Sequence, residues 1–426
     1  MPKSEALYRV SPYRWVILGL LSFSYLLVYV HRMCPAVLAE DIMRSFGASG
    51  ATTGLLASAY FYPYALMQAP GGFIADKLGP RRLVTLSMLA ASLGSVLFAM
   101  SVGVGTAFWS RVLVGLGVSV VLVPTYKALT TWFPAKDYVL GTSLVISIAG
   151  LGGLLAGSPL AWLSESIGWR GSFWVIAGCT MVDALLVWLL VRDKPQDFGL
   201  PPVEPVSGGG DHLEESVPML KVLGMVLGSK DFWLPAGWFF FNGGILFSFA
   251  GLWAGPYFMQ AYAMSKTQAG QVINVFAFGW VFGPLIFAWI AAKVPSRGAV
   301  MGGSMVVWAA ILVWMLARNG AMDLPEIYAW NLIFGFLGAG PAGVCFAAVK
   351  ERFPLRIAGT VTGFTYMFPM IGSALYQPLA GVILDHSGNM ATGLGAADFT
   401  PLFWLYLAST VVAGILAYAL RSKRVR

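Results

Sequence analysis

The chain has 426 residues, of which 58% are hydrophobic and only 11% are charged, whereas about 25% of the residues of an ordinary soluble domain are charged. This composition excludes a water-soluble globular protein and indicates a protein that lies in a membrane. The net charge of +8 does not indicate a nucleic-acid partner, because the lysines and arginines fall in short segments between apolar stretches. The three cysteines, Cys34, Cys179 and Cys345, each lie within an apolar stretch and predict neither disulfides nor a metal site.

Apolar stretches of about 20 residues recur along the chain, and each is long enough for a helix to cross the ~30 Å hydrocarbon core of a bilayer. The first follows Arg14, contains Arg32 and ends without a cleavage site, so we expect it to remain as a membrane span rather than to be removed as a signal peptide. In chain order the sequence predicts twelve spans: 15–38, 52–75, 83–103, 107–130, 139–163, 172–191, 233–258, 269–292, 299–317, 326–349, 358–383 and 401–420.

The predicted fold class is an all-α membrane protein, because these stretches lack the alternating pattern of barrel strands. If the N-terminus is cytoplasmic, all but six of the 27 Lys and Arg residues lie at cytoplasmic ends or loops. The six exceptions are Arg32, Arg44, Arg111, Arg170, Lys266 and Arg318. The positive-inside rule therefore predicts a multi-pass protein of the cell inner membrane with both termini cytoplasmic.

The longest polar segment is rich in proline and glycine and divides the chain into an N-terminal half (1–191), a cytoplasmic linker (192–231) and a C-terminal half (232–426). Short sequences of the first half recur about 218–220 residues later, for example Phe133-Pro134 as Phe353-Pro354. The halves are thus predicted to be parallel six-helix repeats, with a solute site between them near the middle of the membrane. Since one chain supplies both repeats, we expect a monomer.

The turn after the second span reads Gly72-Phe-Ile-Ala-Asp76-Lys77-Leu-Gly79-Pro80-Arg81-Arg82. It resembles the signature loop of the major facilitator superfamily, G-x-x-x-D-[RK]-x-G-[RK]-[RK], with one position shifted by Pro80. The resemblance implies the major facilitator fold and a conformational latch formed by Gly72, Asp76, Gly79, Arg81 and Arg82. Arg111 and the glycines after it resemble a further stretch of that family, and we group Arg111 with the latch. The alternative is a solvated loop whose charges only set the topology.

Arg32 is the most informative residue, because a cation deep in a span costs about 2.5–3.5 kcal/mol unless it is paired or hydrated. Ser22, Tyr25, Tyr29 and Arg32 are spaced by three, four and three residues and share one helix face. A guanidinium offers two parallel donors to a planar anion and keeps its charge. We therefore expect Arg32 to bind a carboxylate, with Tyr25 and Tyr29 orienting it. The alternatives are an ion pair with Asp183 and bonds to backbone carbonyls.

Neutral polar residues of the second half are candidates to complete the pocket, with Asn242, Tyr366 and Gln377 as predicted solute contacts and Asn274 and Asn331 as further polar groups. Each of them can instead bridge helices. His31 and Asp183 are candidate proton carriers. No motif for nucleotide hydrolysis, metal binding or nucleophilic catalysis appears, so we expect neither an enzyme nor a cofactor, and a gradient must drive transport.

The residues from Arg32 to Met43 and from Tyr60 to Gln68 look like a bacterial branch of the superfamily that contains phagosomal amino-acid and nucleoside carriers. The lysosomal dipeptide carrier looks like a distant relative, and the placement of Arg32 is similar to that in the organophosphate and anion:cation symporter branches. The seventh span lacks their matching arginine, which favours a monocarboxylate over a phosphate ester.

We therefore predict a secondary transporter for a small carboxylate-bearing solute, such as an amino acid, dipeptide or organic acid, that works by rocking of its two halves with protons as a candidate coupling ion. The alternatives are a broad-specificity efflux carrier, a nucleoside transporter, a sugar-phosphate or organic-anion exchanger, and a non-transporting solute sensor on the same scaffold.

Overall fold

The computed structural model describes residues 11–68, 70–200, 203, 224–388 and 393–420. Within these residues all regular structure is helical, which confirms the predicted fold class. Most of the predicted linker, from 201 to 223, lies outside the described residues apart from residue 203.

The first half contains nine α-helices: α1 (Tyr13–Met33), α2 (Pro35–Phe46), α3 (Gly50–Ser58), α4 (Phe61–Met67), α5 (Gly71–Ala99), α6 (Val104–Val118), α7 (Leu122–Trp132), α8 (Ala135–Leu155) and α9 (Ser158–Leu190). A short 3-10 helix, η1 (Pro195–Phe198), follows. Several spans are built from two consecutive helices. The first breaks at Cys34, immediately before Pro35, whose ring nitrogen has no proton to donate to the helix.

The second half contains α11 (Lys230–Ser248), η2 (Phe249–Trp253), α12 (Ala254–Ala261), α13 (Lys266–Lys293), α14 (Arg297–Ala317), α15 (Leu324–Ala339), α16 (Ala342–Lys350), α17 (Leu355–Ser387), η3 (Ala396–Phe399) and α18 (Thr400–Ala419). The segment η2 is a π-helix inside the seventh span. Such bulges occur often at functional sites, because they change the direction of the side chains around them.

All twelve predicted spans coincide with helical segments, although the helices are divided differently from the prediction. Among the described residues, ten helices are long and apolar enough to cross a membrane, and Leu140–Leu155 is a shorter apolar helix. Gly79 and Gly168, with φ of 74° and 75°, join the end of one span to the start of the next, so α5 and α9 each extend over a turn. The second predicted span is divided among α3, α4 and the start of α5.

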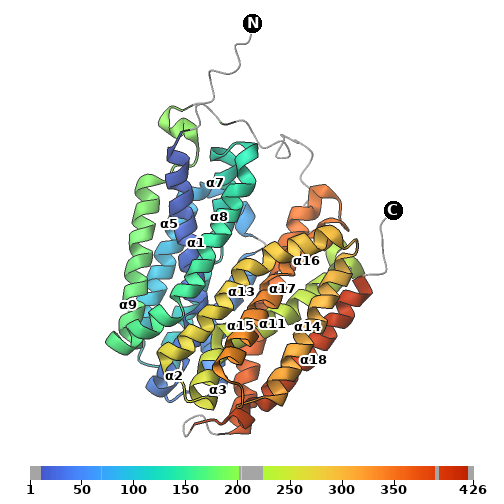
Figure 1. The fold of residues 1–426 in the computed structure, drawn as a ribbon. Helices are drawn as coiled ribbons and strands as arrows, with labels where there is room; N and C mark the ends of the chain where they lie inside the picture. The colour runs from blue at the N-terminus through green and yellow to red at the C-terminus, as the bar shows by residue number, and fades with distance from the viewer. Residues whose placement is uncertain (1–10, 69, 201–202, 204–223, 389–392, 421–426) are drawn as a thin grey trace.

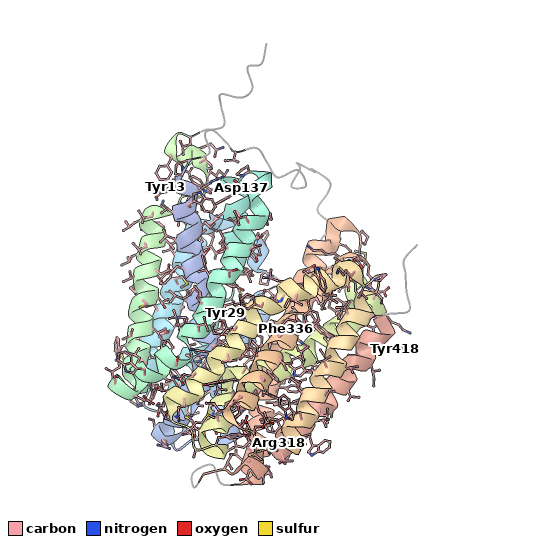
Figure 2. All side chains as sticks on the ribbon, in the orientation of Figure 1. Tyr13, Tyr29, Asp137, Arg318, Phe336 and Tyr418 are labelled. Atoms are coloured by element: carbon pink, nitrogen blue, oxygen red, sulfur yellow. The ribbon has the colours of Figure 1, made fainter. Side chains whose placement is uncertain are left out.

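Figure 1 shows two helical bundles that converge at one end of the molecule and diverge toward the end at which both termini lie. We call these the distal end and the termini end. Tyr13 and Asp137 lie at the termini end, Arg318 lies at the distal end, and Tyr29 and Phe336 lie between them (Figure 2). The bundles contact each other where α3 and α4 pack on α17, and where α8 and α9 pack on α13.

Glycines let the two bundles approach backbone to backbone where α3 meets α17. A Cβ atom at Gly54 would lie 2.6 Å from Cα of Pro378, and one at Gly381 would lie 2.7 Å from the amide nitrogen of Ala51. Both distances are too short for any side chain. Close packing of this kind is typical of helix contacts in membranes, where dispersion rather than the hydrophobic effect holds helices together.

Candidate functional site

Arg32 lies near the end of α1, with only 1% of its surface exposed. Aromatic rings surround its guanidinium group. The distances from the guanidinium carbon to the ring centroids are 4.7 Å for Tyr64, 5.0 Å for Tyr29, 5.5 Å for Phe247 and 5.9 Å for Tyr60. A cation near the face of an aromatic ring gains about 0.5–2 kcal/mol, so these rings offset part of the cost of burying the charge.

The hydrogen-bonding capacity of Arg32 is largely unused within the described residues. Its Nε donates to the hydroxyl of Tyr60 over 3.4 Å, whereas Nη1 and Nη2 are buried and have no hydrogen-bond partner there. No carboxylate of the described residues forms an ion pair with it. A buried guanidinium in this condition is suited to bind an anion through its two parallel donors.

The residues around Arg32 come from both halves of the molecule. Tyr60 precedes α4 and Tyr64 lies within it, four residues later on the same face, and their stacked rings are 5.7 Å apart. Phe247 lies near the end of α11, two residues before the π-helix η2. Tyr366 of α17 packs against Phe239 of α11, with ring centroids 6.2 Å apart. An anion bound to Arg32 would therefore be positioned by both repeats.

The predicted contacts of the first half are buried together. Tyr29 contacts the guanidinium group directly, and Tyr25 packs against Tyr29 with ring centroids 5.4 Å apart. Ser22 is also buried on this face, and its hydroxyl has no partner among the described residues. The helix face predicted from the spacing is thus present, with Tyr25 one ring farther from Arg32 than Tyr29.

The predicted contacts of the second half differ in their surroundings. Asn242 is buried, and its Nδ2 has no partner among the described residues. Gln377 donates from Nε2 to the carbonyl of Phe247 over 3.0 Å, so it supports one of the rings around Arg32. Asn274 donates to Ser158 of the other half over 2.8 Å, and Asn331 donates to a carbonyl of its own helix. Asn274 therefore bridges two helices, as the packing alternative predicts, whereas Asn331 bonds within its own helix.

His31 and Asp183 face away from the guanidinium group of Arg32. The carboxylate of Asp183 is 2.7 Å from the hydroxyl of Ser24, so the alternative in which Asp183 pairs with Arg32 is wrong in this structure. Nε2 of His31 is 3.1 Å from the hydroxyl of Thr180, which itself donates to a backbone carbonyl. Since that hydroxyl has one proton, Nε2 of His31 must be the donor, and its buried Nδ1 has no partner among the described residues.

The predicted latch loop binds residues of its own half and of the start of the linker. Asp76 forms an ion pair with Lys127 of α7 at 2.9 Å. The amide of Arg81 donates to Asp193 over 2.8 Å, and the guanidinium group of Arg81 lies 4.3 Å from the ring centroid of Trp188. Gly79 turns the chain toward this carboxylate with a positive φ. Gly72 lies near the start of α5, and Arg82 is exposed.

Arg111 does not belong to this loop, which corrects the grouping made from the sequence. It is 2% exposed in the interior of the first half. Its Nη1 donates to the carbonyl of His31 over 3.2 Å, and its guanidinium carbon lies 5.4 Å from the ring centroid of Tyr60. Arg111 thus supports the end of α1 that carries Arg32. The reason for the error is that the side chain points into the bundle, which the sequence pattern does not show.

Tyr60, Tyr64 and Phe247 are site residues that were not predicted from the sequence. The spacing of Tyr60 and Tyr64 was a usable signal, because two tyrosines four residues apart in an apolar span share one face. Phe247 gave no such signal, since it is one of many aromatic residues of the seventh span.

Comparison with known proteins agrees with this architecture. The sequence profile of the Major Facilitator Superfamily matches residues 21–316 and, in a second match, residues 245–426. The chain is 22% identical to the D-galactonate transporter of Escherichia coli, covering 96% of this chain and 95% of the relative. It is also 22% identical to a probable hexose phosphate transport protein of Chlamydia pneumoniae, covering 85% of this chain and 83% of the relative.

Among solved structures, a bacterial homologue of the human lysosomal transporter Spinster superposes with a TM-score of 0.70 and 20% identity, covering 97% of this chain and 96% of that one. At this identity the superposition shows a shared fold. The profile match extends over more than half of the chain and shows the family itself. The chain belongs to the major facilitator superfamily of membrane transporters.

Proposed function

We propose that this protein is a secondary transporter for a small organic anion, and that Arg32 binds the carboxylate of the solute. The observation that carries the proposal is the pair of buried nitrogens, Nη1 and Nη2, without a hydrogen-bond partner among the described residues. A structural arginine would be expected to donate from these atoms to carbonyls or to a carboxylate, as Arg111 does from Nη1, while the buried Nη2 of Arg111 has no partner among the described residues. The names of both relatives above, for D-galactonate and hexose phosphate, also describe carriers of anions.

A carboxylate fits this site better than a phosphate ester. The rings around Arg32 are apolar on their faces, and Arg32 is the one cation among the described residues that lies against Tyr29, Tyr64 and Phe247. The fourth ring, that of Tyr60, also lies against Arg111, which already donates to the carbonyl of His31. A single positive charge balances a monocarboxylate, whereas a doubly charged phosphate would retain a net charge in a site of low polarity. A sugar phosphate is therefore the second candidate, favoured by relatives whose names describe transport of hexose phosphate or glycerol-3-phosphate.

The arrangement of the halves supports transport by rocking. The bundles converge at the distal end and diverge toward the termini end (Figure 1). With the cytoplasmic termini that the positive-inside rule predicts, the two bundles lie apart on the cytoplasmic side and are joined on the opposite side. A second conformation, closed at the termini end, would present Arg32 to the other side of the membrane.

Asp183 is the better candidate of the two proposed proton carriers. It is fully buried in α9, and its Oδ1 has no partner among the described residues. His31 lies beside Arg111, and a second positive charge there would be repelled. If solute uptake is coupled to proton movement, a pH-sensitive dye inside liposomes should report a pH change during uptake. Asp183→Asn should abolish this pH change. Proton movement that persists in both Asp183→Asn and His31→Ala would exclude coupling through these residues.

The direct test is ligand-induced thermal stabilisation of the purified protein, because a ligand that binds only the folded state raises its stability by mass action. The panel contains amino acids, dipeptides, short organic acids, sugar acids, sugar phosphates and neutral nucleosides. We expect one carboxylate class to stabilise the wild type and Arg170→Gln, but not Arg32→Ala or Arg32→Lys. Arg170→Gln is the control, since it removes an arginine that lies on the ring of Trp169 and donates to the carbonyl of Ser101, away from the rings around Arg32.

Other outcomes point to other functions. Stabilisation by nucleosides or lipophilic cations that survives Arg32→Ala would make Arg32 structural and would favour nucleoside or efflux transport. Stabilisation by sugar phosphates alone would favour the second candidate. Stabilisation by a carboxylate without uptake into liposomes would favour a solute sensor.

A further inference from the structure

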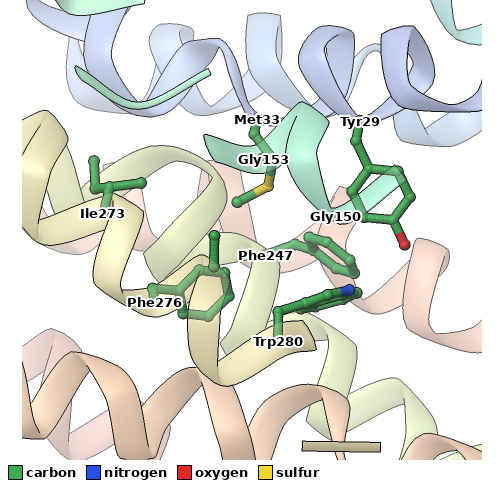
Figure 3. Close-up of a pocket in the computed structure, with 9 residues that line it drawn as sticks. Tyr29, Met33, Gly150, Gly153, Phe247, Ile273, Phe276 and Trp280 are labelled. Carbon is green, nitrogen blue, oxygen red and sulfur yellow. The ribbon is translucent and has the colours of Figure 1, made fainter. Parts of the chain in front are cut away.

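A small cavity lies beside Arg32 at the contact between the two halves (Figure 3). Its walls come from α1, α8, α11 and α13. Tyr29 and Met33 form one side, Phe247 and Trp280 form another, and Gly153 of α8 leaves space between them. Its volume is about 10 Å³, which leaves room for one water molecule or one methyl group.

The cavity is apolar. Isoleucine, phenylalanine and alanine side chains of α13, namely Ile273, Phe276 and Ala277, complete its lining. A buried water molecule needs two to four polar partners, and a lining of this kind does not supply them. An apolar group that entered the cavity would therefore gain contacts without displacing a well-bound water molecule.

The cavity and the guanidinium group of Arg32 share a wall. The rings of Tyr29 and Phe247 line the cavity, and the same rings lie 5.0 Å and 5.5 Å from the guanidinium carbon. Met33, which follows Arg32 in α1, also lines the cavity. A solute whose carboxylate bound the free nitrogens of Arg32 would thus have its neighbouring carbon atoms next to these rings.

We infer that this cavity binds a methyl-sized apolar group of the solute whose carboxylate binds Arg32, so that the protein selects short carboxylates with an apolar branch over polyhydroxylated sugar acids. The inference rests on the proposed function, because it assumes that Arg32 binds a carboxylate. It adds a specificity-determining pocket built by both repeats. Hydroxyl groups placed against these walls would lose hydrogen bonds to water without replacement, which disfavours them.

Gly153 gives a direct way to fill the cavity. A Cβ atom at Gly153 would lie 3.7 Å from Cβ of Ala277, an ordinary van der Waals distance, and no nearer atom lies in its way. Gly153→Ala should therefore fold and occupy the space that the solute's methyl group would use. The neighbouring Gly150 is less suitable, because its Cβ would lie 2.8 Å from Val281. Gly178→Ala is the matched control, since a Cβ there meets nothing within 4 Å.

The experiment compares pairs of carboxylates that differ by one methyl group, glycolate with lactate and glyoxylate with pyruvate, by thermal-shift titration of the purified protein. D-Galactonate serves as the polyhydroxylated comparison. We expect the wild type and Gly178→Ala to bind the methylated member about fourfold more tightly, the effect of burying one methyl group. In Gly153→Ala this preference should disappear while glycolate binding is retained.

A second variant tests the same cavity independently, in case Gly153→Ala does not fold. Ile273→Val removes one methyl group from the wall and should shift the preference toward the ethyl-bearing 2-hydroxybutyrate. Equal binding of both members of each pair by the wild type, or a methyl preference unchanged in both cavity variants, would overturn the inference. D-Galactonate binding that depends on Arg32 and exceeds lactate binding would also overturn it, while leaving the proposed function standing. Failure of every carboxylate to bind would remove the proposed function and this inference together.

Discussion

The two ends of the molecule differ in how their polar side chains are paired. At the distal end, charged and amide groups of one half bind the other half. At the termini end, the residues of the latch loop bind residues of their own half and the start of the linker, and not the other half. The polar contacts thus agree with the convergence of the bundles in Figure 1 and identify the contacts that must break when the distal end opens.

Asp385 of α17 makes the most extensive of the distal contacts. Its two carboxylate oxygens accept hydrogen bonds from the amides of Gly50 and Ala51, over 2.7 Å and 2.8 Å, at the N-terminus of α3 in the other half. A carboxylate at a helix N-terminus satisfies free amides and interacts favourably with the helix dipole. One side chain therefore joins the two halves.

Three further pairs connect the halves nearby. Lys266 forms an ion pair with Asp41 at 2.5 Å, Gln260 donates to Glu40 over 2.8 Å, and the hydroxyl of Thr267 donates to Glu165 over 2.8 Å. Lys266 was an exception to the positive-inside pattern, and its partner across the halves accounts for its position. The comparison teaches that the halves are held by directional bonds at the distal end, so single substitutions should change the balance between conformations.

Replacing Asp385 should have the largest effect on this balance. Asp385→Ala removes two charge-assisted hydrogen bonds between the halves. We expect the equilibrium between the two conformations to shift by about 2 kcal/mol, or thirtyfold, toward the conformation that is open at the distal end. Double electron–electron resonance between spin labels at Val102 and Leu324, exposed on different halves, should show a longer distance. Asp385→Asn should have a smaller effect, since asparagine also caps helices. An unchanged distance in Asp385→Ala would show that the contact does not hold the distal end closed.

Gly79→Ala tests whether the loop at the termini end is built into one half. The positive φ disfavours a Cβ by about 1–2 kcal/mol, and that Cβ would lie 2.8 Å from the carboxylate of Asp193. We expect a lower melting temperature with little change in the distal label distance. Gly72→Ala is the control on the same helix, since a Cβ there meets nothing within 4 Å. Equal melting temperatures for the two variants would show that neither the positive φ of Gly79 nor the space beside Asp193 requires a glycine at this position.

Lys266→Gln should shift the conformational balance less than Asp385→Ala. Because the ion pair with Asp41 is partly exposed, we expect the conformational equilibrium to shift by only about 1 kcal/mol, or fivefold, toward the conformation that is open at the distal end. The same label distance measures this effect, and 0.5 M salt should reproduce part of it in the wild type. Lys293→Gln, which alters a lysine beside Trp289 within one half, is the control. A shift as large in Lys293→Gln would mean that net charge, rather than this pair, sets the balance.

Asp76→Asn should have the smallest effect on the conformation seen here, because Asp76 is 74% exposed and its pair with Lys127 lies within one half. We expect a change of at most about twofold in the balance measured by the labels. Transport into liposomes should nevertheless fall strongly if the latch acts when the termini end closes, with membrane insertion unchanged. Full transport by Asp76→Asn would remove the latch hypothesis and leave the topology-setting loop.

Much of the fold could be predicted from the sequence, because the signals are local. A span needs only about 20 apolar residues, and each of the twelve predicted stretches coincides with helical segments of the structure, although the breaks within them were not predicted. Arg32 was recognised as a site candidate for the same reason, since a cation in an apolar stretch is conspicuous. The role of Arg111 was misjudged, because whether an arginine faces a loop or the interior depends on the packing of its helix.

The sequence by itself determined that this is an all-helical membrane protein of two repeats with a buried arginine in its first span, because hydrophobicity and its periodicity are properties of consecutive residues. Only the tertiary structure decided what surrounds that arginine and which end is closed. The rings of Tyr64 and Phe247 reach Arg32 from different halves, and Asp385 caps a helix that begins more than three hundred residues earlier. Such contacts depend on how the repeats pack, and no local pattern encodes that packing.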